Sequence, residues 1–200
     1  MWVRSAMWVR SATWVGVVAM SVGGLAGCGS KPIDGPVTDV SDLAAVCDGS
    51  HFARAAPFTG APPHPVVVIP PDTGNAQTYG GTHPPPVLFL DPSLGDVGPA
   101  WTTRDPADVQ LVACTERDDD TESGQTCPFD DDPPTPLRFA SYTLHVYEAS
   151  TGVESGTSQI EARNDTCPSS ALVDENDPVV FSTPSPQQYL DALRGFVNRP

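Results

Sequence analysis

Residues 139–162 carry the clearest strand pattern in the chain: FASYTLHVYE (Phe139–Glu148), then ASTG (Ala149–Gly152), then VESGTSQIEA (Val153–Ala162). Apolar and polar residues alternate along the first segment, as they do in a strand with one buried face. The buried face is predicted to carry Ala140, Tyr142, Leu144 and Val146, and the solvent face Ser141, Thr143, His145 and Tyr147. ASTG suits a four-residue turn, so the sequence predicts a hairpin whose second strand is 153–162.

Other apolar runs add strands beside this hairpin. Val109–Thr115 (VQLVACT) is apolar at nearly every position, which is typical of a central strand. Val66–Ile69 and Val87–Leu90 are each bracketed by prolines, which cannot donate to a strand ladder. We therefore expect these two runs to be edge or isolated strands.

A helix is expected at each end of the domain. Ser185 and Pro186 form a helix start, and apolar residues then recur at helical spacing on one stripe. The stripe consists of Tyr189, Leu190, Leu193, Phe196 and Val197. This helix is expected to pack on the sheet, with docking to a partner or a membrane as the alternative. Near the other end, Ser41 is expected to cap a short helix over 42–46, with Gly49 as its stop.

Together these elements predict a mainly β fold: an antiparallel sheet or small sandwich with short N- and C-terminal helices and two disulfides. A single domain is expected over 41–200, behind a flexible tether at 28–40. Its proline-rich segment, 57–106, is predicted to be irregular wrapping chain with an exposed loop at 72–82, or alternatively a polyproline surface for a partner.

The charge balance excludes one class of partner. The chain carries 10 Lys and Arg against 25 Asp and Glu, a net charge of -15. Nucleic-acid binding needs a basic surface that neutralises phosphates. We therefore predict no nucleic-acid partner.

The first 27 residues have the pattern of a signal peptide. Arg4 and Arg10 precede an uncharged apolar stretch, 13–27, which is shorter than the roughly 20 residues a membrane-spanning helix needs. The stretch ends Leu25-Ala26-Gly27-Cys28, which resembles the lipobox of bacterial lipoproteins. The resemblance implies that Cys28 is the first mature residue and carries a diacylglyceryl thioether. The alternative is an ordinary signal peptide followed by a cysteine.

Four cysteines remain besides Cys28: Cys47, Cys114, Cys127 and Cys167. An even number in an exported chain predicts two disulfides, and the absence of a C-x-x-C pair argues against zinc. Three pairings are open. We favour Cys114 with Cys127 across a hairpin-like loop, and Cys47 with Cys167.

Candidate chemistry is sparse. Acidic runs at 118–122, 130–132 and 174–177 are predicted to be solvated hairpin tips, with a loose calcium site as the alternative. Ser123 and Phe129 stand where an EF-hand needs glycine and glutamate. No nucleophile motif accompanies the histidines, which are His51, His64, His83 and His145. We predict no catalytic residue, no metal site and no cofactor.

Parts of 101–168 resemble a secreted domain of bacterial envelope proteins that have no agreed activity. The resemblance is carried by Trp101, the run 106–114 (PADVQLVAC), Cys127, the run 142–149 with Thr151-Gly152, and Cys167-Pro168. It implies an exported, disulfide-bearing β-domain and supplies no catalytic residue.

We therefore expect a lipid-anchored protein on the extracytoplasmic side of a cell membrane, with a non-catalytic binding or envelope-accessory role and an envelope protein as its partner. Two alternatives remain. A hydrolase would need a cleft where carboxylates converge with a histidine, and a calcium-dependent adhesion module would bind the metal in its acidic loops.

Overall fold

The structure is a computed structural model that describes residues 30–71, 101–103, 105–129, 132–168, 171, 173 and 177–200. The expectation of a mainly β fold with short helices and two disulfides is confirmed. The elements are β1 (Lys31–Ile33), the 3-10 helix η1 (Val40–Val46), β2 (Ser50–Phe52), β3 (Val66–Ile69), the 3-10 helix η2 (Pro106–Asp108), β4 (Leu111–Phe129), β5 (Asp132–Glu148), β6 (Glu154–Ala162), β7 (Val180–Phe181) and α2 (Pro186–Val197).

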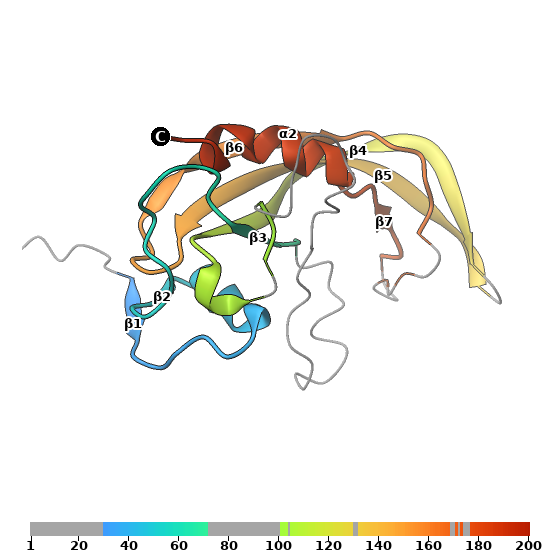
Figure 1. Cartoon of the computed structure of the whole chain (residues 1–200). Helices are drawn as coiled ribbons and strands as arrows, with labels where there is room; N and C mark the ends of the chain where they lie inside the picture. The colour runs from blue at the N-terminus through green and yellow to red at the C-terminus, as the bar shows by residue number, and fades with distance from the viewer. Residues whose placement is uncertain are drawn as a thin grey trace, which may run out of the picture.

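One mixed sheet forms the body of the molecule (Figure 1), with strand order β3-β4-β5-β6 and with β7 paired to β5. The predicted hairpin is confirmed, because β5 and β6 pair antiparallel and the turn closes with Gly152 N donating to the Glu148 carbonyl at 2.8 Å. β3 is an edge strand, as expected. It pairs parallel with β4, and β7 pairs parallel with β5, so the sheet is not purely antiparallel.

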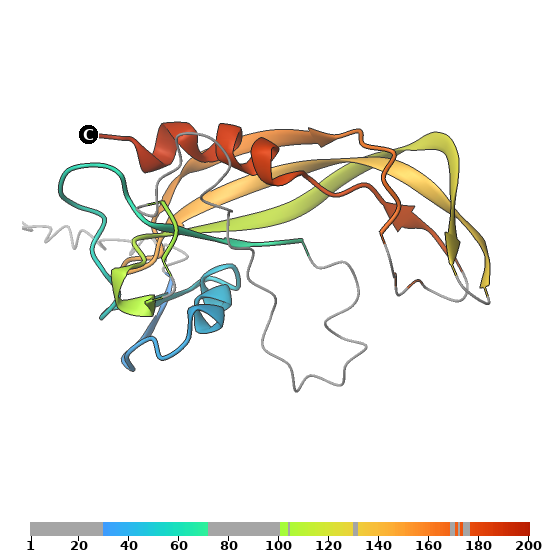
Figure 2. The same ribbon diagram turned by 45° about the vertical axis from the view of Figure 1, so that its right-hand side comes forward.

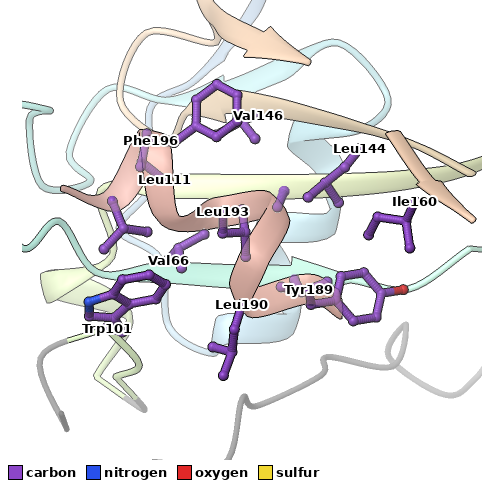
Figure 3. Packing of buried hydrophobic residues seen from close by; sticks show 13 residues of the cluster. Val66, Trp101, Leu111, Leu144, Val146, Ile160, Tyr189, Leu190, Leu193 and Phe196 are labelled. Atoms are coloured by element: carbon purple, nitrogen blue, oxygen red, sulfur yellow. The ribbon is translucent and has the colours of Figure 1, made fainter. Parts of the chain in front are cut away.

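α2 covers one face of the sheet, as its apolar stripe predicted (Figure 3). Tyr189, Leu190 and Leu193 are at most 2% exposed, and they belong to one cluster with side chains of β3 to β6. The helix begins at a capping box in which Ser185 Oγ accepts from Gln188 N and Gln188 Oε1 accepts from Ser185 N. This cap fixes where the helix starts, and the stripe fixes which side faces the sheet.

The N-terminal segment covers the opposite face at one end of the sheet. Leu43 and Val46 of η1 lie in a second cluster with Val67 and Val112. The residue that caps η1 is Asp39 and not Ser41, because the Asp39 carboxylate accepts from Ser41 N at 2.8 Å and Asp42 completes a capping box. The helix therefore begins one residue before Ser41.

A small second sheet takes one of its two strands, β1, from the segment 28–40 that was expected to be a flexible tether. β1 pairs parallel with β2, with Lys31 opposite Ser50. The backbone N–H of Lys31 also donates to the Gly49 carbonyl at 2.8 Å. The chain is therefore held in the fold from Ser30 onward.

Two disulfides are present, but the favoured pairing is wrong. The bonds are Cys47–Cys114 and Cys127–Cys167. Cys114 and Cys127 both lie in β4, so about 13 residues at roughly 3.3 Å each separate them by about 40 Å. A disulfide tolerates a Cα separation of at most about 7 Å. Each cysteine therefore pairs with the segment that packs over its own end of β4.

Several expectations fall outside the described residues. They concern the signal peptide, Cys28, the loop at 72–82 and the possible strand Val87–Leu90. In the described ranges, no helix combines the length and apolar character needed to cross a bilayer.

Candidate functional site

The feature most suited to binding is a polar stretch of sheet that we call the open face. The N-terminal layer covers this side as far as Cys114, and from Glu116 onward β4 turns polar and exposed. Figure 2 shows the long β4–β5 hairpin running well past the N-terminal layer. Strand register places the following side chains together on the open face: Glu116 and Asp119 of β4, Ser141, Thr143 and His145 of β5, and Thr157, Gln159 and Glu161 of β6.

A bulge in β4 shapes the open face. The register shifts between Arg117 and Asp119, so Asp118 is an extra residue opposite β5. Its carboxylate accepts a hydrogen bond from Thr143 Oγ1 at 2.7 Å. The acidic run expected at a hairpin tip therefore lies within a strand, and two of its carboxylates, those of Asp118 and Asp120, have cross-strand contacts.

A shallow pocket of about 190 Å³ opens beside the bulge. Ligand pockets for small molecules typically measure about 300 to 1,000 Å³. The volume suits a single side chain of a partner better than a whole small ligand. The pocket is lined by Asp119, Asp120, Thr121, Phe139, Ala140, Ser141, Glu161 and Arg163.

Two ion pairs involve residues that line the pocket. Arg138 Nη1 lies 2.6 Å from Asp120 Oδ1, and this carboxylate raises the pKa of the guanidinium above its usual range. Arg163 Nη2 lies 3.3 Å from Glu161 Oε2, with both side chains more than half exposed. An exposed pair of this kind contributes at most about 1 kcal/mol of stability. Arg163 is therefore available to exchange Glu161 for another anion.

His145 lies on the solvent side of β5, as expected, between two carboxylates. Its Nδ1 is 3.0 Å from Glu154 Oε1, and its Nε2 is 3.9 Å from Glu116 Oε2. Burial, followed by the charges of Glu154 and Glu116, raises the pKa of the neighbouring Tyr147. This cluster lies on the strand face, outside the residues that line the pocket.

Two other histidines have contacts within the fold. His64 is 3% exposed and lies within hydrogen-bond distance of Gln110 Oε1 (2.7 Å) and the Arg199 carbonyl (2.9 Å). His51 Nδ1 lies 2.9 Å from Ser30 Oγ. His83 lies outside the described residues.

Metal binding has no assembled site in the part of the chain that the structure describes. There, no three His, Cys, Asp or Glu side chains are grouped so that they could hold an ion. The side chains of five acidic residues lie outside the described part of the chain, so this part does not contain the whole of the loose calcium site: Asp130, Asp131, Asp132, Asp174 and Glu175.

The amino-acid sequence did not predict the pocket beside the β4 bulge. Alternation placed Ser141 on the polar face, which was a usable signal. Neither the β4 bulge nor the position of Arg163 has a marker in the sequence, because both depend on how β4 and β6 pair with β5.

We compared the chain with protein-family models, with curated proteins and with solved structures, and nothing matched. The resemblance to bacterial envelope domains therefore remains a prediction from the residues that carry it.

Proposed function

We propose that the protein is a lipoprotein, anchored through Cys28 on the extracytoplasmic side of a cell membrane, and that it binds an envelope protein through the open face without catalysing a reaction. The observation that carries the anchor is the position of Leu25-Ala26-Gly27-Cys28 directly behind the apolar stretch 13–27. Small residues before the cysteine give a peptidase access to the bond, and the thiol accepts the lipid as a thioether.

The cysteine pairs support an exported location. Both bonds join residues that are distant in the sequence, 67 and 40 positions apart. Disulfides of this structural kind persist in oxidising compartments and are rare in the cytosol. A lipid anchor with two acyl chains holds such a domain stably at a membrane, whereas a single chain does not.

The open face supports a binding role. Its polar side chains come from three adjacent strands, and a large part of this face carries no covering layer in the described residues. The acidic side chains Glu116, Asp118 and Asp119 lie near each other there, so a partner with basic side chains fits the charge. The pocket beside Arg163 would take one side chain of such a partner.

The anchor is tested by growing cells that express the full chain with an alkyne analogue of palmitate. We expect the wild type and a Gly29→Ala control to incorporate the label and Cys28→Ser to lack it. Label retained by Cys28→Ser, or absent from the wild type, contradicts the proposal.

The binding role is tested by photocrosslinking in intact cells. A crosslinking amino acid replaces Ser141 on the open face or Asp191 on the exposed side of α2. We expect position 141 alone to give a discrete adduct with an envelope protein. Identical adducts at both positions, or none at 141, contradict a role for the open face.

A further inference from the structure

The structure bears on which end of the domain faces the membrane. Ser30, the first described residue, is fastened to the fold by its side chain. Its Oγ donates to the Thr151 carbonyl at 2.9 Å and lies 2.9 Å from His51 Nδ1. Ser30 is therefore seated on the turn that joins β5 and β6.

The turn is shaped to receive Ser30. Gly152 has φ +66, and a Cβ at this position would lie 2.7 Å from Ser30 Cβ and 2.8 Å from Ser30 Oγ. A contact under 3.0 Å forces atoms to move, so the glycine leaves the space that Ser30 fills. β1 follows at once and pairs with β2. Ser30 is thus held by the β5–β6 turn that it contacts and by the pairing of β1, which follows it in the chain.

The chain between Cys28 and Ser30 is short. Two residues of fully extended backbone span at most about 7 Å. If Cys28 carries lipid, Ser30 must lie within about that distance of the anchored cysteine, and the turn is in direct contact with Ser30. A long flexible linker, which would let the domain turn freely, has no room in this interval.

Figures 1 and 2 place β1 and the β5–β6 turn at one end of the sheet and the tip of the β4–β5 hairpin at the other. β5 has 17 residues, which at roughly 3.3 Å each corresponds to about 50 Å of strand. The two ends of the sheet are therefore far enough apart to be distinguished by their distance from a membrane.

From these contacts we infer that the β5–β6 turn rests on the phospholipid headgroups and that the β4–β5 tip stands away from them; this inference rests on the proposed lipidation of Cys28. Side chains around the turn are mixed in character: the carboxylates of Glu148 and Glu154 flank it, and apolar and basic side chains lie beside them. Val153 is the most exposed large apolar side chain described, at 57%. Lys31 is exposed on β1, and Arg199 donates to the Ser155 carbonyl beside the turn.

The orientation also explains the position of the open face. Its residues lie along β4, β5 and β6 between the turn and the tip. A partner embedded in the same envelope would meet these side chains from the side.

The test uses residues 28–200, which retain every described residue, with the Cys28 thiol coupled to a maleimide lipid in phosphatidylcholine vesicles. Azidophenylalanine at Val153 or at Gln125 carries a clicked fluorophore, and nitroxide-labelled headgroups act as the quencher. Gln125 is the matched control, exposed and close to the hairpin tip. We expect loss of fluorescence at 153 and unchanged fluorescence at 125.

A second variant inserts ten Gly-Ser residues between Gly29 and Ser30, which gives a coil of about 18 Å root-mean-square length. We expect the insertion to relieve the quenching at 153. Equal quenching at 153 and 125, or quenching at 153 that the insertion leaves unchanged, overturns the inference. Because the lipid is attached chemically, this result is independent of whether cells modify Cys28, which mass spectrometry of the native protein decides separately.

Discussion

Ser30 Oγ donates a hydrogen bond to the carbonyl of Thr151, 121 residues later in the chain, at 2.9 Å. This bond joins the first described residue to the turn of the central hairpin. A flexible tether was expected around Ser30, but this residue is held by the fold. The same contact places the β5–β6 turn close to Cys28, and it makes the stability of the domain sensitive to a side chain at Gly152.

Gly152→Ala is expected to disrupt the seat of Ser30. The new Cβ would meet Ser30 Cβ at 2.7 Å, and the positive φ costs roughly 1 kcal/mol or more for any residue with a Cβ. We expect a loss of stability of more than about 1 kcal/mol in urea unfolding.

Two variants control this prediction. Ser30→Gly in the Gly152→Ala background removes the collision, so it should restore part of the loss. Gly195→Ala, in α2 with no atom within 4 Å of the new Cβ, should stabilise by up to about 1 kcal/mol. Wild-type stability for Gly152→Ala would mean that Ser30 does not pack against Gly152.

The disulfide Cys47–Cys114 fastens η1 to the sheet across 67 residues. Replacing both cysteines with serine should destabilise the domain by about 4 kcal/mol, because the unfolded chain regains the freedom of a long loop. The double variant Cys127→Ser/Cys167→Ser removes the bond that closes a 40-residue loop, so it should lose slightly less stability. Guanidinium unfolding measures both. An unchanged midpoint for the first pair would show that the bond does not form.

Tyr142 makes the stability of the folded domain depend on pH in the alkaline range. Its side chain is 1% exposed, its hydroxyl donates to the Ser182 carbonyl at 2.8 Å, and burial raises its pKa from 10.0 to about 12. The unfolded chain therefore loses this proton first. The stabilisation is complete below about pH 10 and is lost as the pH rises to about 12, by on the order of 2 kcal/mol.

Tyr142→Phe is the matched variant. It removes the hydroxyl and leaves the Ser182 carbonyl without this donor, so we expect a loss of about 1 to 2 kcal/mol at neutral pH. Between about pH 10 and 12, however, its stability should fall less than that of the wild type. Parallel pH profiles for the two proteins, measured by urea unfolding, would contradict the assignment.

Leu193 tests the packing of α2. Its side chain is fully buried in the cluster between helix and sheet. Leu193→Ala should cost about 2 to 5 kcal/mol in thermal or denaturant unfolding, because the removed methyl groups leave a cavity. Asp191→Ala, exposed on the same helix, should change stability by no more than about 0.5 kcal/mol. Equal effects of the two variants would contradict the docking of α2 described here.

The sequence predicted the elements whose patterns are local. Alternation identified Phe139–Glu148 and its partner strand, and the stripe from Tyr189 to Val197 identified α2 with its buried side. These patterns are strong because each follows from the period of a single element. They also placed His145 on the solvent side of β5.

Features that depend on pairing between distant segments could not be predicted from local sequence patterns. β4 continues through a polar stretch to Phe129 because β5 pairs with it over its whole length, and that pairing has no local signal in 116–126. The favoured disulfide pairing failed for this reason, since a loop was expected where the strand continues. The pocket was missed because it depends on a bulge and on Arg163, which follows a neighbouring strand.

Lipidation of Cys28 is tested by mass spectrometry of the mature protein isolated from its own membranes. We expect an N-terminal peptide that starts at Cys28 and carries a diacylglyceryl group on the thiol, with the preceding 27 residues removed. A free thiol at Cys28 in the isolated protein, or a leader still attached, would show that the protein is not anchored by a lipid at this cysteine.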